Sequence, residues 1–414
     1  QNYFSKIVIT TDNVGSSTTD FLDISGNIIG EFNVYELRKM GFKKREELIE
    51  KWIRMGSEYD KEESDILIQV DEYARIINGI VGKNYIPQVP MYILVILQSL
   101  DNGSTMKDFQ NKTNGYYYEL LIRQLISDVG VSSNDIATLD NYLIILASKI
   151  FHKDSKTMSE EDWIDFHRSY VKDYEISKSQ LKFMDYQSKL LKSNIIRLLP
   201  DGNYTFGYNY LFYYYVAQYL SSNINKEKVK KEIEYLIKTS HYNLHANILI
   251  FLVHLSKDEF ILNAVVQEAQ SILGNSKELK LEEDIGDLNA LIEELPRLVV
   301  ESVSAVENRK KVNENRDKSS SLNEEKDFLH NESSLNNEED DLSIIIDKAI
   351  KISEIIGQIL RNYSGSILGE LKRELLSSAF SVSLKAGNEM IEVIKSNQNS
   401  LIKYIETKLT EEEF

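Results

Sequence analysis

The residues whose types and spacing come nearest to a reactive site are two histidines, His241 and His245, four positions apart. On a helix this spacing puts two imidazoles on one face, as in a zinc-binding pair. No neighbouring acidic residue completes a ligand set, although His254 follows further along, so the pattern favours ordinary helix histidines. His152 and His167 are interpreted as structural in the same way. We therefore expect no metal site.

The short motifs that hold a nucleotide or activate a nucleophile are missing. Gly82-Lys83-Asn84 comes closest to a phosphate-binding loop, but it lacks the required preceding glycine and a hydroxyl residue after the lysine. No Gly-x-Ser-x-Gly turn is present, and the absence of cysteine excludes thiolate metal sites, cysteine nucleophiles and disulfides. We expect no complete catalytic site and no nucleotide hydrolysis by this chain alone.

Composition bounds the class of protein. The 414 residues predict about two to four structural units. Hydrophobic residues (42%) and charged residues (27%) occur at globular frequencies, and no apolar run is long enough to cross a membrane. With no cysteine and no signal peptide, a cytoplasmic protein is predicted. The chain begins with Gln1 rather than Met, which is typical of a fragment or a processed product.

The fold class predicted from periodicity is mainly α with a short β segment at the start. Lys6–Thr11 and Gly26–Phe32 read as strands, so residues 1–43 form one segment. Residues 44–130 carry helical periodicity. Within them Pro90 opens a helix that is apolar on every side and should be buried.

The most informative region is residues 131–222. Thr138–Phe151, a helix capped by Ser159, and Ser177–Lys192 are followed by two short strands around Asp201-Gly202. Three helices followed by a hairpin is the arrangement of a winged-helix domain. A strongly aromatic helix, Tyr210–Leu220, closes the unit.

The remaining chain divides into three predicted segments. Residues 223–305 read as successive amphipathic helices in a repeat-like array. Residues 306–341 are rich in Asn, Glu, Ser, Lys and Asp with few large apolar residues, which predicts a flexible linker. Residues 342–414 resume a strong apolar stripe and predict a helical bundle.

Two features suggest nucleic acid, and each has a plainer interpretation. Basic residues crowd the third helix and the first hairpin strand: Lys178, Lys182, Lys189, Lys192 and Arg197. Acidic neighbours and the net charge of −17 favour a solvated face and disfavour binding to nucleic acid or anionic membranes. Tyr213–Tyr215 could stack on bases, but in an apolar helix core packing is favoured.

Several segments together resemble a known family. They are Tyr35-Glu36-Leu37, Lys44–Trp52, Ile86–Leu94, Phe206-Gly207-Tyr208, Tyr214–Ala217 and Ile356–Ser366. In order and spacing they resemble the C-terminal half of bacterial STAND NTPases of the NACHT-like type. The resemblance implies that the nucleotide loop and the metal-binding acids lie before Gln1, in a part absent from this chain.

The resemblance also implies positions near a nucleotide. Thr10 and Thr11 would end the sensor strand of the nucleotide-binding core, followed by Asp12 where relatives have an arginine. Pro90 matches the proline that packs against adenine. Tyr208 stands at the position of the histidine that contacts the ADP phosphate in relatives, and Tyr213 at that of a glutamate.

The function that the resemblance implies is the regulatory half of a signal-dependent switch that oligomerises, as in some antiphage defence systems. ATP or ADP with Mg would bind only if the core is present, and none is expected to bind this chain alone. Partners would be a protein ligand or further copies, without membrane or nucleic acid. The alternatives are a helical protein-interaction scaffold without nucleotide binding and, more distantly, a winged-helix DNA-binding protein.

Overall fold

The computed structural model describes residues 39–55, 62–81, 88–101, 119, 121–123, 125–126, 129–130, 135–176, 181–280, 305–329, 342–397 and 400. The chain divides into two units, Gln1–Lys39 and Met40–Phe414, and the described elements lie in the second. The strands predicted at Lys6–Thr11 and Gly26–Phe32 lie outside the described residues, as do residues 281–304 of the predicted helical array.

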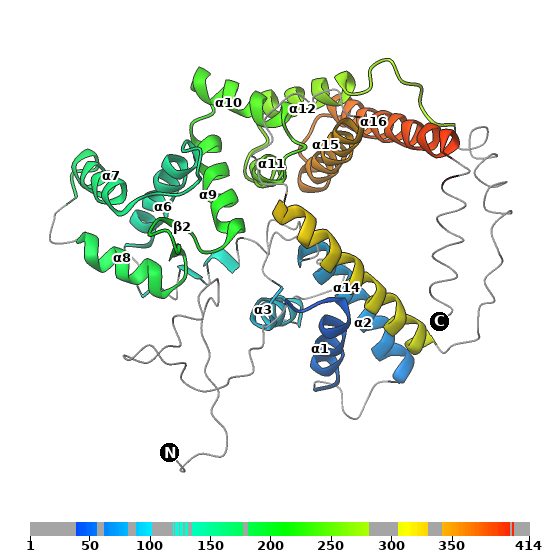
Figure 1. The fold of residues 1–414 in the computed structure, drawn as a ribbon, viewed down its shortest axis with the longest axis horizontal. Helices are drawn as coiled ribbons and strands as arrows, with labels where there is room; N and C mark the ends of the chain where they lie inside the picture. The colour runs from blue at the N-terminus through cyan, green and yellow to red at the C-terminus, as the bar shows by residue number, and fades with distance from the viewer. Residues whose placement is uncertain are drawn as a thin grey trace, which may run out of the picture. The chain divides into compact units, whose positions relative to one another are not determined.

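The described part of the chain is mainly helical, in agreement with the predicted class, and contains one two-stranded sheet (Figure 1). Its elements are α1 (Phe42–Met55), α2 (Glu63–Val81), α3 (Pro90–Asp101), α6 (Ile136–Phe151), α7 (Glu160–Asp173), α8 (Phe183–Lys192), β1 (Ile196–Leu198), β2 (Tyr204–Phe206), α9 (Asn209–Ser222), α10 (Glu227–Lys238), α11 (Asn243–Leu255), α12 (Glu259–Ser271), α14 (Ala305–Leu329), α15 (Leu342–Tyr363) and α16 (Gly369–Ser396).

The predicted order of three helices, a hairpin and an aromatic helix is confirmed. The Ser159 side chain caps α7 by accepting a hydrogen bond from the Asp162 backbone N–H at 3.2 Å. Strands β1 and β2 pair antiparallel, with Ile196 opposite Phe206. At the turn between them Asp201 accepts from the Asn203 backbone N–H at 3.0 Å. These are the local hydrogen bonds that the sequence motifs predict.

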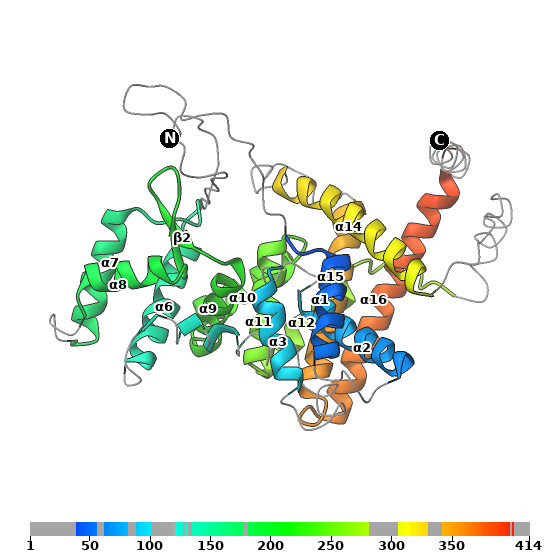
Figure 2. The same ribbon diagram turned by 90° about the horizontal axis from the view of Figure 1, so that it is seen from below.

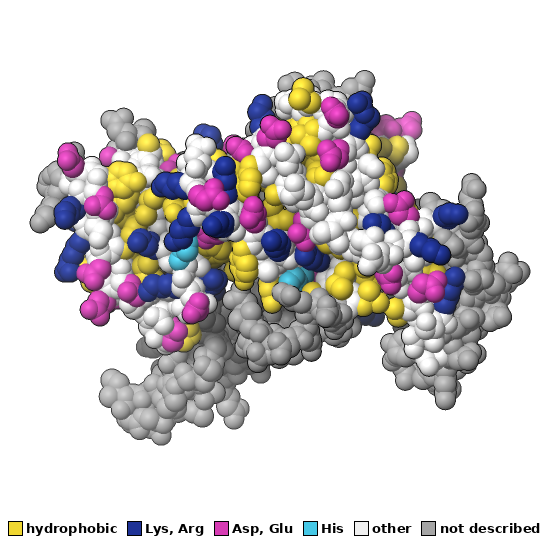
Figure 3. All heavy atoms as spheres, turned by 90° about the horizontal axis from the view of Figure 1, so that it is seen from above, with side chains coloured by type: hydrophobic (Ala, Val, Ile, Leu, Met, Phe, Trp, Pro, Cys, Tyr) yellow, Lys and Arg dark blue, Asp and Glu magenta, His cyan; other side chains and the backbone are white. Residues whose placement is uncertain are grey.

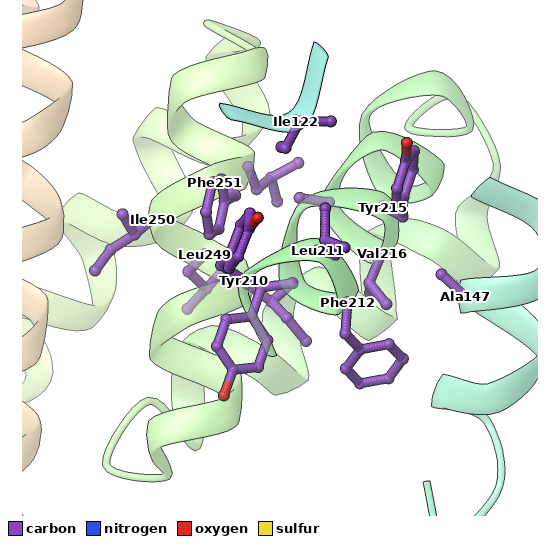
Figure 4. Close-up of a cluster of buried hydrophobic side chains, with 14 of the residues drawn as sticks. Ile122, Ala147, Tyr210, Leu211, Phe212, Tyr215, Val216, Leu249, Ile250 and Phe251 are labelled. Atoms are coloured by element: carbon purple, nitrogen blue, oxygen red, sulfur yellow. The ribbon is translucent and has the colours of Figure 1, made fainter. Parts of the chain in front are cut away.

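Helix α9 is the centre of the apolar core. It packs against α6 on one side and α11 on the other, and in Figure 4 its side chains point toward Ala147 of α6 and Leu249 and Phe251 of α11. Tyr213 and Tyr215 are buried, which confirms their predicted place in the core. A helix that is covered on two sides needs no polar face. This explains why the sequence of α9 is apolar all round and shows no division into an apolar and a polar face.

Helices α10 to α12 share a core with the later pair α15 and α16. The stripe of α15 is fully buried and consists of Ala349, Ile352, Ile355, Ile356 and Ile359. This helix packs against α11, α12 and α16, and the Tyr363 hydroxyl donates to the His254 carbonyl oxygen at 2.7 Å. The predicted array and the predicted bundle are therefore in contact through α15.

The segment predicted as a flexible linker, residues 306–341, is helical in the part that the structure describes. Residues 305–329 form α14, which packs across α1 (Figures 1 and 2). Its sequence carries no apolar stripe, so periodicity predicts no helix there. Polar contacts with α1 and α2 hold it instead, among them an ion pair from Arg309 to Asp71 at 2.9 Å.

Candidate functional site

Two of the predicted site residues lie on elements that contact each other, helix α3 and the start of α9. Pro90 is the first residue of α3. At this position the backbone N–H has no partner within the helix, so a proline costs no hydrogen bond, and its fixed φ suits the helix. Its side chain is exposed, whereas Tyr92, Ile93 and Leu97 further along the helix are buried. The predicted buried helix with Pro90 in its first turn is thus confirmed.

Tyr208 lies at the junction between β2 and α9, as the residue before the first helical turn. Its ring is half-buried, and its side chain makes no capping hydrogen bond to the helix. The preceding Gly207 donates its backbone N–H to the Ile195 carbonyl oxygen at 2.8 Å. A Cβ at Gly207 would lie 2.0 Å from the Asn194 carbonyl oxygen. Only glycine therefore allows this approach, which fixes where Tyr208 stands.

Tyr92 connects the two elements through a cluster of three tyrosines. Its ring centroid lies 5.9 Å from that of Tyr208 and 6.2 Å from that of Tyr210, both edge-on. The Tyr210 hydroxyl donates to the Tyr92 hydroxyl at 3.5 Å. Edge-to-face pairs of this kind stabilise a contact beyond the area that they bury. We call Tyr92, Tyr208 and Tyr210 the tyrosine cluster.

Burial determines what the tyrosine cluster can do chemically. Burial raises the pKa of Tyr92 far above its ordinary value, and the neighbouring Tyr210 and Tyr208 hydroxyls add to the shift. Burial likewise raises the pKa of Tyr210. Both phenols are neutral at physiological pH, so they can stack and exchange hydrogen bonds but cannot act as bases. The cluster suits binding or mechanical contact rather than proton transfer.

The other predicted site residues stand apart from this cluster or cannot be placed. Thr10 and Thr11 lie outside the described residues. Tyr213 is buried on α9 and packs in the core. Sequence reasoning missed Tyr92 and Tyr210 as the link between α3 and α9, although Tyr92 stands only two positions after Pro90 in the same apolar helix.

Two of the buried histidines, His245 and His167, are hydrogen-bonded to neighbouring groups of the folded chain. His245 Nδ1 lies 2.8 Å from the Thr239 hydroxyl, and burial lowers the pKa of His245 to about 4. His167 is buried between the Tyr142 hydroxyl, at 3.2 Å, and the Leu181 carbonyl oxygen, at 3.3 Å. No group of three or more candidate metal ligands occurs among the described residues.

The basic stretch around α8 is only partly described, because Lys178 lies outside the described residues. Lys189 and Lys192 occupy the last turn of α8, while Asp185 occupies the first. Over the face of the molecule shown in Figure 3, Lys and Arg side chains likewise lie among Asp and Glu side chains. Mixed signs of this kind favour solvation over attraction of a phosphate backbone.

Comparison with known proteins places one segment in a family context. The family model described as Novel STAND NTPase 4 matches residues 156–216, from the turn before α7 through the hairpin and Tyr208 into α9. This match relates the segment to the STAND NTPases. No curated protein and no solved structure matches the chain. In the described part of the chain, no helix combines the length and apolar character needed to span a bilayer.

Proposed function

We propose that this chain is the regulatory and sensing part of a STAND-type signal-transducing switch. In this proposal the α6 to α9 unit with its hairpin is a winged-helix lock that closes on a nucleotide-binding core. The observation that carries the proposal is the contact between Tyr92 and Tyr208. It joins the helix opened by Pro90 to the turn that holds Tyr208, inside the segment that matches the family.

The chemistry of the two positions fits a nucleotide in different ways. The exposed Pro90 ring offers a flat apolar surface for a base, and the Tyr208 phenol is a neutral hydrogen-bond donor. Relatives with an imidazole there can offer a positive charge to a phosphate, whereas Tyr208 cannot. The charge of ADP or ATP, with Mg, would therefore be met by the core, which includes Thr10 and Thr11 in this proposal.

The switch would work by population shift. Contacts that form only when ADP is bound favour the closed arrangement, and a ligand on the later helices favours the open one. The open form would then associate with further copies, and such a switch suits antiphage defence. A ligand shifts this balance only by its difference in affinity for the two forms, so the closed contacts need not be strong.

The test uses the gene product that carries the nucleotide-binding core, with ADP affinity measured by calorimetry. Removing the Tyr208 hydroxyl in Tyr208→Phe should weaken ADP binding by about tenfold, the worth of one hydrogen bond. Tyr219→Phe, at a half-buried tyrosine elsewhere on α9, should leave it unchanged. The proposal is wrong if the coding region upstream of Gln1 encodes no phosphate-binding loop, or if both variants bind ADP equally.

A helical interaction scaffold is the second candidate, and one observation favours it. Helix α16 exposes large apolar side chains along its length, including Leu376, Phe380 and Met390. Apolar side chains spaced along one helix are typical of a surface that binds another helix or a second copy. A scaffold would associate through α16 with no effect of nucleotide on its stability, and Phe380→Ser would abolish that association in analytical ultracentrifugation.

A further inference from the structure

The start of helix α1 has an unusual charge pattern for a helix N-terminus. Its first residues are Phe42, Lys43, Lys44 and Arg45, and no acidic residue stands in the first turn. The N-terminal end of a helix carries a partial positive charge and unpaired backbone N–H groups, so it favours anions and disfavours cations. Three cations in succession at this end are therefore unfavourable unless an anion joins them.

Lys43 pairs with Glu314 of α14 and Lys44 pairs with Glu47, so Arg45 is the cation left without an ion pair among the described residues. The backbone N–H groups at this helix end are met by another carboxylate of the distant helix α14. One carboxylate oxygen of Asp317 accepts from the Phe42 backbone N–H at 2.5 Å, and the other accepts from that of Lys43 at 3.2 Å. A Cβ on Gly41 would lie 2.4 Å from the first of these oxygens. Glycine thus lets the carboxylate approach the backbone closely, as glycines do in phosphate-binding loops.

Arg45 supplies a second and independent sign of an anion site. Its side chain is only 1% exposed, and none of its three guanidinium nitrogens has a hydrogen-bond partner within the described residues. The guanidinium carbon lies 4.3 Å from the Phe42 ring centroid, so the side chain turns back toward the start of α1. Burial lowers the pKa of Arg45 to about 10 and the charge of Asp317 opposes this shift, so the group stays charged at neutral pH.

A buried cation with five unused donors is costly, and a single monoanionic carboxylate does not satisfy it here. A phosphate group offers more acceptor oxygens and a larger negative charge, and it suits both the backbone N–H pair and a guanidinium. The arrangement therefore has the donors for a phosphate but holds a smaller anion that belongs to the chain itself.

We infer that the N-terminal turn of α1, together with Arg45, is a binding site for free phosphate or a small phosphate monoester, and that Asp317 occupies it as an internal substitute. Docking of α14 on α1 and binding of phosphate then exclude each other. By linkage, each weakens the other by the same factor. This site is separate from the tyrosine cluster and does not depend on the proposed nucleotide switch.

The experiment measures inorganic phosphate binding to the whole chain by calorimetry. Asp317→Ala should bind phosphate about tenfold more tightly than the parent chain, because the competing carboxylate is gone. The matched control is Asp258→Ala, which removes the carboxylate that caps α12 from its own N-terminus through the Phe260 backbone N–H. That helix has no buried arginine at its start, so no phosphate site should appear.

Arg45 provides the opposing test. In the Asp317→Ala background, Arg45→Gln should abolish the gained affinity and Arg45→Lys should restore part of it, with circular dichroism confirming that both variants fold. Glycerol phosphate in place of phosphate shows whether an ester substituent is accepted. The inference is overturned if Asp317→Ala binds phosphate no more tightly than the parent chain, or if Arg45→Gln leaves that affinity intact.

Discussion

Helices α9 and α11 meet through apolar side chains, whereas α1 and α14 meet through charges and a helix cap. In the first interface Leu249 and Phe251 of α11 are almost completely buried, and the Phe251 ring packs edge-on against Tyr214 of α9. In the second, Asp317 caps α1, Glu314 pairs with Lys43, and Arg309 pairs with Glu46 at 3.5 Å and also with Asp71 of the adjacent α2. Apolar burial is insensitive to salt, while exposed ion pairs weaken as salt screens them. Release of α14 is therefore expected to leave the core around α9 undisturbed.

Removing a buried ring from the apolar interface should have the largest effect. Phe251→Ala deletes a side chain that packs edge-on against Tyr214 at 6.0 Å, and it should lower the free energy of unfolding by about 3–5 kcal/mol. Phe380→Ala, at a ring that is 62% exposed, should change it by less than about 0.5 kcal/mol. Urea unfolding measures both, and equal losses would mean that α9 and α11 do not form the stabilising core.

Acid should destabilise the fold through one buried histidine at the start of α11, which contacts Thr239 and Tyr235 near the end of α10. The folded-state pKa of His245 is about 4, below the ordinary value of 6.5, because burial disfavours its charged form. The unfolded chain therefore binds the extra proton between these values, and stability is lost as the pH falls from 6.5 toward 4. The loss approaches about 3 kcal/mol, since one pKa unit corresponds to about 1.4 kcal/mol.

His245→Gln tests this assignment, because it keeps an acceptor near Thr239 and removes the titrating ring. Stability measured against pH should be flatter for the variant between pH 4 and 6.5 and should run parallel to the parent chain above pH 7. Parallel curves over the acid range as well would show that other groups cause the acid loss.

Two glycines stand at close contacts of different kinds, Gly207 against a backbone oxygen and Gly41 against a side-chain carboxylate. Gly207→Ala would press a methyl group on the Asn194 backbone oxygen, which cannot move aside, and should destabilise the hairpin by about 1–3 kcal/mol. Gly41→Ala would press on the Asp317 carboxylate, a side-chain end that can rotate away. Hydrogen exchange should therefore increase in β1 and β2 for the first variant, and in α14 and the first turn of α1 for the second. The reverse pattern would contradict the comparison.

The sequence predicts well wherever neighbouring residues decide the structure. Ser159 and Asp201-Gly202 carry their own hydrogen-bonding signals, so the helix and the hairpin turn were predictable from a few residues. The buried stripe of α15, including Ile352 and Ile356, follows from helical spacing alone. In the candidate site, Pro90 and Tyr208 were found through resemblance to a family, and each sits at the start of a helix.

Contacts between distant residues were not predictable in this way. Helix α14 lacks an apolar stripe, and the residue that Asp317 caps, Phe42, is 275 positions away in the sequence. The contact between Tyr92 and Tyr210 spans 118 positions. Charges that pair with distant parts of the fold leave no periodic pattern in the sequence. A polar segment such as α14 therefore has the composition of a linker even when it forms a helix with partners elsewhere in the chain.

The smallest expected effect belongs to the ion pairs of α14. Arg309→Gln removes the contacts to Asp71 and Glu46 and should cost about 0.5–1 kcal/mol, as for partly exposed pairs. In the parent chain, raising NaCl from about 0.1 M to about 1 M shortens the screening length from ~10 to ~3 Å and should speed hydrogen exchange in α14. Exchange in α9 and α11 should stay unchanged.

The salt response and the variant should act on the same contacts, so their effects should not add. In Arg309→Gln, α14 should exchange quickly at low salt and respond less to added salt than the parent chain does. Arg168→Gln is the control, because Arg168 forms a surface pair with Asp165 at 3.1 Å within α7 and should leave α14 unaffected. If the α14 response to salt persists in full in Arg309→Gln, the remaining charged contacts between α1 and α14, the Lys43–Glu314 pair and the Asp317 cap, carry the salt dependence, and the Gly41→Ala variant then tests the cap.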